Sequence, residues 1–279
     1  TVKAGQLNPN NPDDLIKIER KINCSTTDGK NALYWWHGRV YSRVPGERDR
    51  LLFNVHGFNA RDCKSFTDAA RGTGYRSVSR EMLIYTDPTT GEILRTWKNP
   101  WTGEQLEVLH VANDPVNMRE ATFAKDKDGK PRAASSIGFV KDGRMLNGGG
   151  AARLFYQNPL GGEFQNNIGG WYHAMEFGTT ETTLDDLLDA NSDAIKDRVL
   201  TWVRISKFLP WMKMGDRAGV VVFHTAGLRV NGWEDVPDLI RNEVKQNWPA
   251  WQEAPPIDDA RPNMTSWDQF KRWMEGKKK

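Results

Sequence analysis

The chain has 279 residues, of which 38% are hydrophobic and 10% aromatic, enough to bury the core of one large domain. Its 39 basic and 36 acidic residues are well mixed and give a formal net charge of +3. The lone basic cluster, Lys277 to Lys279, does not form the stripe that nucleic-acid binding needs. No apolar run reaches the roughly 18 residues of a membrane helix. We therefore expect neither a nucleic-acid partner nor a membrane span.

Residues 1–30 are predicted to form an N-terminal arm followed by a short helix. Asn11-Pro12-Asp13-Asp14 has the residues of a helix start, with Asn11 as the cap and acids in the first turn. The helix is expected to end near Ile22.

Residues 31–230 are predicted to be mainly β. Residues 31–44 and 50–58 alternate and are rich in aromatic and β-branched side chains, which predicts a hairpin around Val44-Pro45-Gly46-Glu47. Residues 59–75 are polar and are expected to form a long loop. A further strand is predicted over residues 75–86.

Two similar turns follow, DPTTG at residues 87–91 and NPWTG at residues 99–103. In each, Asp or Asn suits the first turn position, Pro fixes φ at the second, and Gly can adopt the left-handed conformation. About eight residues separate the turns, the length of one strand. The repeat therefore predicts two reversals of a β-meander, and Asp142-Gly143 predicts another hairpin.

The later strands are expected at residues 152–160, 171–177, 199–209 and 218–230, with glycine pairs at 161–162 and 169–170 between them. Residues 182–198 are predicted to be helical. Two C-terminal helices are expected within residues 231–279, one capped by Asp235 and one by Thr265 or Ser266. The predicted fold is a single domain, 1–279, in which an antiparallel meander closes into a calycin- or lipocalin-like β-barrel with peripheral helices.

The two cysteines, Cys24 and Cys63, have no metal-binding spacing and are compatible with one disulfide. Asn23 and Asn263 begin glycosylation sequons. The chain begins with Thr1, which suggests that a leader or other residues were removed. These features favour a secreted or exported protein.

No cofactor or metal is predicted. The five histidines form no His-x-His or His-Glu-x-x-His spacing, and no nucleotide, flavin or Gly-x-Ser-x-Gly fingerprint occurs. The run Asp189-x-Asn191-x-Asp193 begins like a calcium loop, but Ala194 and Leu200 stand where that loop needs Gly and Glu. Three histidines could still meet in space, which keeps a metal-dependent hydrolase or lyase as an alternative.

The most informative strand is residues 199–209, where Trp202, Arg204 and Ser206 share one face. If that face points into a barrel, the charge of Arg204 needs a carboxylate or a ligand oxygen. Glu176 could make a structural ion pair with Arg204, or the two could anchor a ligand. The candidate catalytic residues are Arg204, His224, Tyr172 and Glu176. The candidate substrate-binding residues are Trp36, His56, Tyr85, Trp97, His110, Trp202 and Trp211.

Residues 34–47, 80–108, 201–224 and 262–274 resemble the domain-of-unknown-function family 1838, which occurs in bacteria and fungi, often behind an export signal. The resembling motifs are Tyr-x-Asp-x-x-Thr-Gly-Glu…Trp-x-Asn-Pro-x-Thr-Gly-Glu and Leu-Pro-Trp-Met-x-Met-Gly. Residues 59–63 and 147–170 match no family pattern. The resemblance implies, through fungal members used in natural-product pathways, a cofactor-free cyclase of hetero-Diels–Alder type. It assigns no catalytic residue.

The predicted function is therefore cofactor-independent cyclisation or cycloaddition of an apolar terpenoid or aromatic small molecule in a barrel cavity. Such a reaction needs aligned partners and a donor to polarise a carbonyl. A lipocalin-like carrier without catalysis is the alternative. The sequence is compatible with a homo-oligomer and does not determine the oligomeric state.

Overall fold

The computed structural model describes residues 3–133, 138–148, 151–157, 160 and 171–277. Its elements in chain order are α1 Pro12–Asn23, β1 Ala32–Arg43, β2 Arg50–Asp68, β3 Gly72–Thr86, β4 Thr96–Lys98, β5 Gln105–Glu107, β6 Val111–Val116, β7 Thr122–Phe123, β8 Phe139–Lys141, β9 Arg144–Asn147, β10 Ala151–Gln157, β11 Trp171–Thr183, α2 Leu184–Leu188, β12 Arg198–Ser206, η3 Pro210–Met212, β13 Val220–Val230, η4 Trp233–Asp235, α3 Asp238–Asn247, η5 Pro249–Gln252 and α4 Ser266–Gly276.

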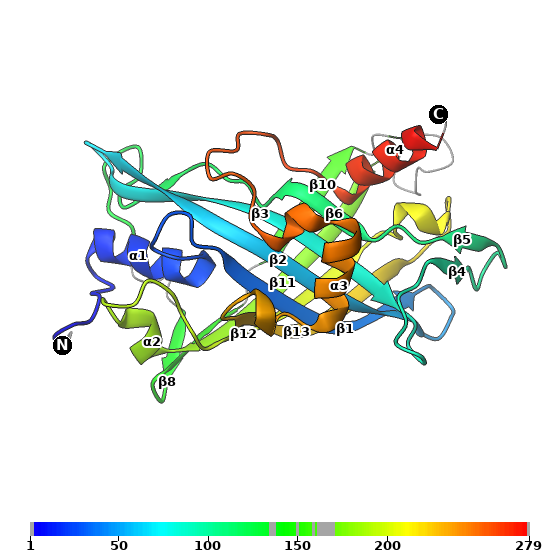
Figure 1. Cartoon of the computed structure of the whole chain (residues 1–279), viewed down its shortest axis with the longest axis horizontal. Helices are drawn as coiled ribbons and strands as arrows, with labels where there is room; N and C mark the ends of the chain where they lie inside the picture. Colours follow the sequence, from blue (N-terminus) through cyan, green and yellow to red (C-terminus); the bar gives the residue numbers. More distant parts are fainter. Residues whose placement is uncertain (1–2, 134–137, 149–150, 158–159, 161–170, 278–279) are drawn as a thin grey trace.

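The fold is mainly β, as the sequence predicts, and is built on one large antiparallel sheet with helices around it (Figure 1). Its strand order is β6-β3-β2-β1-β13-β12-β11-β9-β8, with β10 also on β11 and β7 on β3. The last long strand, β13, returns to pair with the first, β1. This pairing brings residues 170 to 200 positions apart onto neighbouring strands.

The two ends of the sheet are bridged by α4 instead of by a ladder of strands. Among the described residues, no strand pairing joins β6 to β8 or β10. The side chain of Gln269 in α4 accepts a hydrogen bond from Ala112 N (3.0 Å) and donates one to His110 O (2.9 Å). It thus satisfies backbone groups at the edge of β6 that a strand would otherwise pair. On the other side, Trp267 of α4 packs against Tyr172 of β11.

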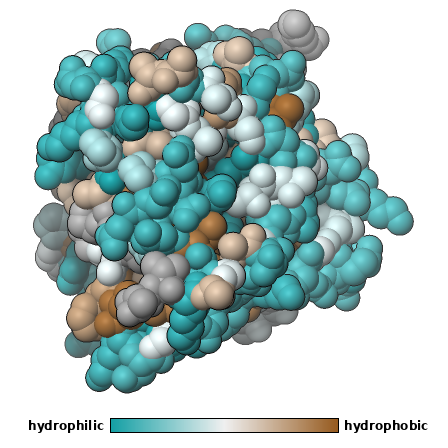
Figure 2. All heavy atoms as spheres, turned by 90° about the vertical axis from the view of Figure 1, so that its left-hand side faces the viewer, coloured by the Kyte–Doolittle hydropathy of each residue, from teal (hydrophilic) through white to brown (hydrophobic). Residues whose placement is uncertain are grey.

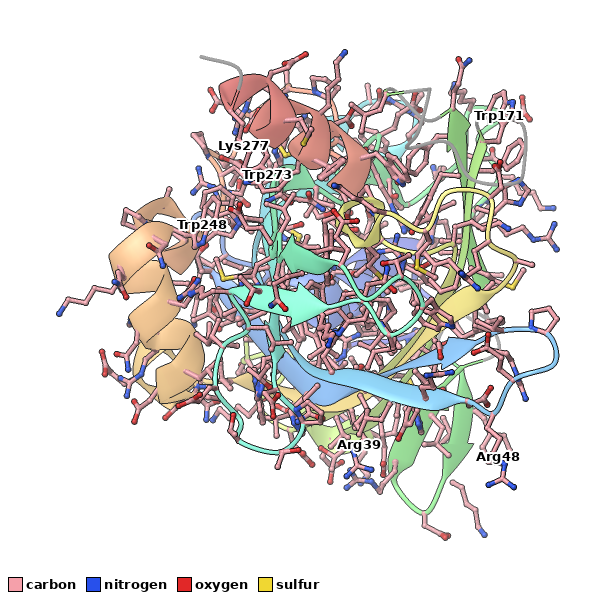
Figure 3. All side chains as sticks on the ribbon, turned by 90° about the vertical axis from the view of Figure 1, so that its right-hand side faces the viewer. Arg39, Arg48, Trp171, Trp248, Trp273 and Lys277 are labelled. Carbon is pink, nitrogen blue, oxygen red and sulfur yellow. A yellow bond between two sulfur atoms is a disulfide. The ribbon has the colours of Figure 1, made fainter. Side chains whose placement is uncertain are left out.

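The sheet is curved and has a buried group of apolar side chains on each face. The concave face holds the larger group, which includes Phe53, Val55, Leu83 and Phe223. On the convex face, α3 packs Ile240 and Val244 against residues of β2 and β3, among them Phe58, Met82 and Ile84. Figure 3 shows α3 and α4 outside the strands, whose inner side chains fill the interior.

At the other end of the molecule, α1 and α2 pack together around Leu15, Ile18 and Leu187. The fully buried ammonium of Lys21 donates to Asp186 O (2.7 Å) and Asp189 O (2.9 Å), which satisfies carbonyls at the end of α2. The surface over this end is mostly hydrophilic (Figure 2).

The repeated turns are confirmed as hairpin turns. The side-chain oxygen of Asp87 accepts hydrogen bonds from Thr89 N and Thr90 N, and Asn99 does the same for Trp101 N and Thr102 N. Gly91 and Gly103 have φ of 77° and 75°, the left-handed conformation that glycine favours. The strands beside them are shorter than predicted, since β4 and β5 have three residues each.

Other local predictions have mixed outcomes. Asn11 caps α1, and Thr265 forms a capping box with Asp268 at α4, both as expected. The prediction of a long loop over residues 59–75 is wrong. β2 continues to Asp68 and β3 begins at Gly72, and the two strands pair over this stretch. Two of the polar side chains at those positions, Asn59 and Arg61, lie on the concave face of a paired strand and so do not indicate a loop.

The helix predicted over residues 182–198 is also wrong in extent. It ends at Leu188, after which a turn leads into β12. The third helix begins at Asp238 instead of near Asp235, because Pro237 occupies its N-cap. The glycine pairs at 161–162 and 169–170, and Lys278 and Lys279, lie outside the described residues.

Cys24 and Cys63 form a disulfide between the end of α1 and β2. Asn23 is half-buried and its amide donates to Glu19 O and Tyr75 Oη, whereas Asn263 is exposed. No helix among the described residues is long and apolar enough to cross a membrane.

Candidate functional site

The concave face of the sheet contains a cavity of about 220 Å³, called here the central cavity. Five strands from both halves of the sheet contribute its walls, together with the segment after β6. Its lining residues are Tyr34, Trp36, Asn59, Arg61, Glu81, Asn117, Glu176, Thr180, Arg198, Leu200, Thr201 and Trp202.

One wall of the central cavity is aromatic and apolar. Trp36 of β1 and Trp202 of β12 meet edge to face, with ring centroids 6.1 Å apart, and Leu200 extends the wall. Gly57 of β2 makes room for Trp36, because a Cβ there would lie 1.9 Å from the indole. Strand alternation predicted that Leu200 and Trp202 share one face, and Trp36 and Trp202 were predicted binding residues; the structure places all three at the cavity.

Arg204 lies buried at one end of this wall, beside Glu176, which the sequence offered as an ion-pair partner, and beside Tyr172. Its Nη2 donates to Tyr172 Oη (2.8 Å), and its Nη1 lies 3.7 Å from Glu176 Oε1. Burial by itself would lower the pKa of Arg204, but Tyr172 and Glu176 outweigh it and raise the pKa. Arg204 is thus a permanently charged group that fixes Tyr172 and Glu176 at the cavity.

Glu81 of β3 is a cavity carboxyl whose pKa is strongly raised. Burial, and then the nearby Glu176, raise its pKa to about 7, although Arg204 and Arg61 pull it downward. The side chain is half-buried, since it faces the cavity space. A carboxyl with this pKa can both donate and accept a proton near neutral pH. We name Glu81 and Glu176 the carboxyl pair.

The other end of the cavity is basic. Arg198 Nη1 donates to Tyr34 Oη (2.9 Å), and the guanidinium groups of Arg198 and Arg229 lie 5.2 and 5.8 Å from the Tyr34 ring. Burial by itself would raise the pKa of Tyr34, but Arg198, Arg229 and Arg61 outweigh it and lower the pKa. Burial also lowers the pKa of Arg61.

The sequence profile of a family described as "Protein of unknown function (DUF1838)" matches residues 29–274, which is most of the chain. The chain belongs to this family. The family resemblance inferred from the motifs is thereby confirmed. The match does not test whether the chain is a cyclase. A comparison with curated proteins finds no match.

Three predicted binding residues of this DUF1838 protein lie away from the central cavity, in the interior beyond it. Tyr85, Trp97 and Trp211 pack around Phe53, with Tyr85 4.8 Å and Trp211 5.9 Å from the Phe53 ring. All three are less than 9% exposed and belong to the concave core. Their contacts are those of packing residues.

The histidines do not gather at the cavity. His224 is exposed on the convex side of β13, opposite the inward-facing Phe223 and Thr225. His56 lies on the convex face of β2 with its ring 4.7 Å from that of His37. Within the described residues, no three His, Cys, Asp or Glu side chains are grouped as metal ligands. The structure therefore does not bring together the histidines that the metal-dependent hydrolase hypothesis requires.

His110 is buried beside Tyr85 and serves as a structural acceptor. Its Nδ1 accepts a hydrogen bond from Tyr85 N (3.1 Å), where a strand would otherwise place a carbonyl. Burial lowers its pKa to about 4, despite the opposing effect of Glu243. The imidazole is thus neutral at pH 7.

We expect this DUF1838 protein to lose stability on acidification because of His110. The pKa of His110 is about 4 in the folded chain and ordinarily about 6.5, so the unfolded chain binds the extra proton first as the pH falls. Between pH 7.5 and pH 5 the wild type should lose about 2 kcal/mol of unfolding free energy relative to His110→Asn. Urea unfolding at both pH values measures this difference. Equal losses in the two proteins would contradict it.

Sequence reasoning missed Glu81, Arg61 and Arg198. Glu81 lies on the same face of a predicted strand as Leu83 and Tyr85. The pattern therefore indicated a carboxyl on a face that also carries large apolar side chains. Arg61 was hidden by the prediction of a loop at residues 59–75. Arg198 stood at the end of the predicted helix.

Proposed function

We propose that the protein is an enzyme that binds a small apolar molecule, of terpenoid or aromatic type, and catalyses its cyclisation by proton transfer. The observation that carries this proposal is the carboxyl pair, which faces the central cavity beside the wall of Trp36 and Trp202. Perturbed carboxyls in a cavity are characteristic of acid–base sites. The curved sheet, with α4 across its open seam, would then act as a barrel around the substrate.

In the proposed reaction Glu81 is the acid. Its carboxyl proton passes to a carbonyl oxygen or alkene carbon of the substrate, and the electron pair of a second alkene closes the ring onto the resulting cationic carbon. A proton then leaves the neighbouring carbon for a carboxylate of the pair, so the product is an isomer of the substrate. Trp36 and Trp202 present π-faces that stabilise a cation, and Arg204 holds the carboxyl pair and Tyr172 in place.

The size of the cavity favours one reactant over two. At about 220 Å³ it is smaller than the roughly 300–1,000 Å³ of drug-sized ligand sites. A single folded chain of about ten carbons closing on itself suits this space better than a cycloaddition between two molecules. Intramolecular closure also benefits most from a wall that holds the reacting ends together.

We further propose that the protein works outside the cytosol in natural-product metabolism. The disulfide supports export, because such bonds persist in oxidising compartments. The metabolic role is what the motif resemblance to fungal members implies; the matched family is described as of unknown function.

Product formation from acyclic monoterpenoids tests the proposed function. Citronellal, geraniol and geranic acid are incubated with the purified protein, and cyclic isomers are measured by gas chromatography with mass detection. We expect a cyclic isomer from at least one of them, formed about 10- to 100-fold more slowly by Trp202→Ala because the reacting ends lose their wall. Arg39→Met, on an exposed residue that points away from the interior (Figure 3), should leave the rate unchanged.

The same samples distinguish an enzyme from a carrier. Saturable binding with every ligand recovered unchanged would contradict the cyclase and favour a lipocalin-like carrier. The carrier remains the alternative because a cavity with an apolar wall also suits storage or transport.

A further inference from the structure

The basic end of the central cavity holds three arginines that have no carboxylate partner among the described residues. Arg61, Arg198 and Arg229 surround Tyr34, and Arg229 is only 7% exposed. Among the described residues, none of the three has a carboxylate within 4.0 Å. Arg229 Nη1 instead donates to Lys21 O (3.1 Å).

Arg61 is the least satisfied of these groups. Its Nε is buried and has no hydrogen-bond partner within the described part of the chain. Strand alternation on β2 places Arg61 on the same concave face as Asn59, and both line the cavity. Arg61 is half-buried, and a guanidinium partly withdrawn from water without a carboxylate is costly unless something outside the chain compensates it.

The acids near the basic end do not fully neutralise its arginines. Glu81 is an acid that raises the pKa of Arg61, and its own raised pKa leaves it only partly ionised near neutral pH. A second, polar cavity of about 120 Å³ shares Arg61 and Asn117 with the central cavity and also contains Arg76, Arg119 and the acid Glu120. Its three arginines outnumber this one carboxylate.

We propose that the basic end binds an anionic group of the substrate, a carboxylate or a phosphate, through Arg61 and Arg198. The guanidinium fork matches the paired oxygens of either group. The apolar body of the substrate then lies along Trp36 and Trp202, beside the carboxyl pair, of which Glu81 stands opposite Asn59 on the neighbouring strand. This assignment rests on the proposed function, since it names the substrate class of the same cavity.

An anion site at Arg61 would also fix the orientation of the substrate in the cavity. An anion held at Arg61 points the rest of the molecule toward Glu81 and away from the surface. A neutral ligand has no such preference along the wall. Amphipathic anions are thus the expected substrates, and neutral hydrocarbons are expected to bind weakly.

Calorimetric binding of three matched probes tests the inference: 1-naphthoate, 1-naphthyl phosphate and the neutral 1-naphthol. We expect at least one anion to bind the wild type about 10- to 100-fold more tightly than 1-naphthol, and the preference to be lost in Arg61→Met. The tighter anion identifies carboxylate or phosphate. Arg61→Lys, which keeps the charge but loses the fork, should retain part of the preference. Arg39→Met should retain all of it.

The outcomes separate this inference from the proposed function. If 1-naphthol binds the wild type as tightly as both anions, the anion site is wrong and the cyclase proposal stands. If no probe binds, the cavity is not a ligand site and both proposals fall. If Arg61→Met is unfolded, a fall in wild-type affinity for the anions but not for 1-naphthol between 50 and roughly 500 mM NaCl supports the site, and its absence overturns it.

Discussion

Glu81→Gln is expected to lower the rate of cyclic product formation by about 10²- to 10⁴-fold, the range that a general acid contributes. The amide has nearly the same shape as the carboxyl but cannot deliver the proton. Ligand affinity, measured by calorimetry, should change little because Trp36 and Trp202 are untouched. Glu92→Gln, on an exposed turn residue, is the matched control.

The same variant has a signature in stability that a merely misfolded protein would not show. The pKa of Glu81 is raised to about 7 from an ordinary value of 4.5, so its contribution to stability is complete below pH 4.5 and is lost as the pH rises to 7. At pH 8, Glu81→Gln should be more stable than the wild type by about 1–2 kcal/mol, since the cavity partly exposes the group. A variant that converts substrate at the wild-type rate would show that Glu81 is not the acid.

Removing the disulfide with Cys24→Ala and Cys63→Ala together is expected to lower the free energy of unfolding by about 4 kcal/mol. The bond joins residues 39 positions apart, and opening it restores the conformational freedom of that loop to the unfolded chain. The loss should appear mainly in the urea midpoint. Reducing the wild type with dithiothreitol should give the same midpoint as the double variant.

The native contacts near the disulfide indicate why the unfolded state dominates this effect. Arg20 Nη2 donates to Cys63 O (2.9 Å) and its Nη1 donates to Ser65 Oγ, so α1 stays attached to β2 without the bond. The cavity depends on this attachment, because Tyr34 Oη donates to Ile22 O (2.9 Å) at the end of α1. An unchanged midpoint after reduction would contradict the expected stabilisation.

The two ends of the cavity differ in how far the sequence could predict them. Alternation on two strands offered Glu176 as a possible ion-pair partner of Arg204, and the structure places the two 3.7 Å apart. The three arginines around Tyr34 of β1 come from β2, β12 and β13, so no local pattern connects them.

Local physical rules determined what the sequence could decide by itself. Alternation determined the strands, the Pro-x-Thr-Gly pattern determined the turns, and Asn11 and Thr265 determined two helix starts, because each depends on residues within a few positions. Two cysteines allowed one pairing. The family motifs were equally local.

Only the tertiary structure decided which face of each strand is concave and which distant strands meet there. Alternation divides a strand into two faces but does not say which is buried when both carry apolar residues, as on β1, β2 and β13. His224 and His56 therefore lie on the convex face, whereas Glu81 and Arg61 reach the cavity. The protonation of Glu81 depends on burial and on Glu176 from a strand 95 positions away, which only the folded sheet brings near.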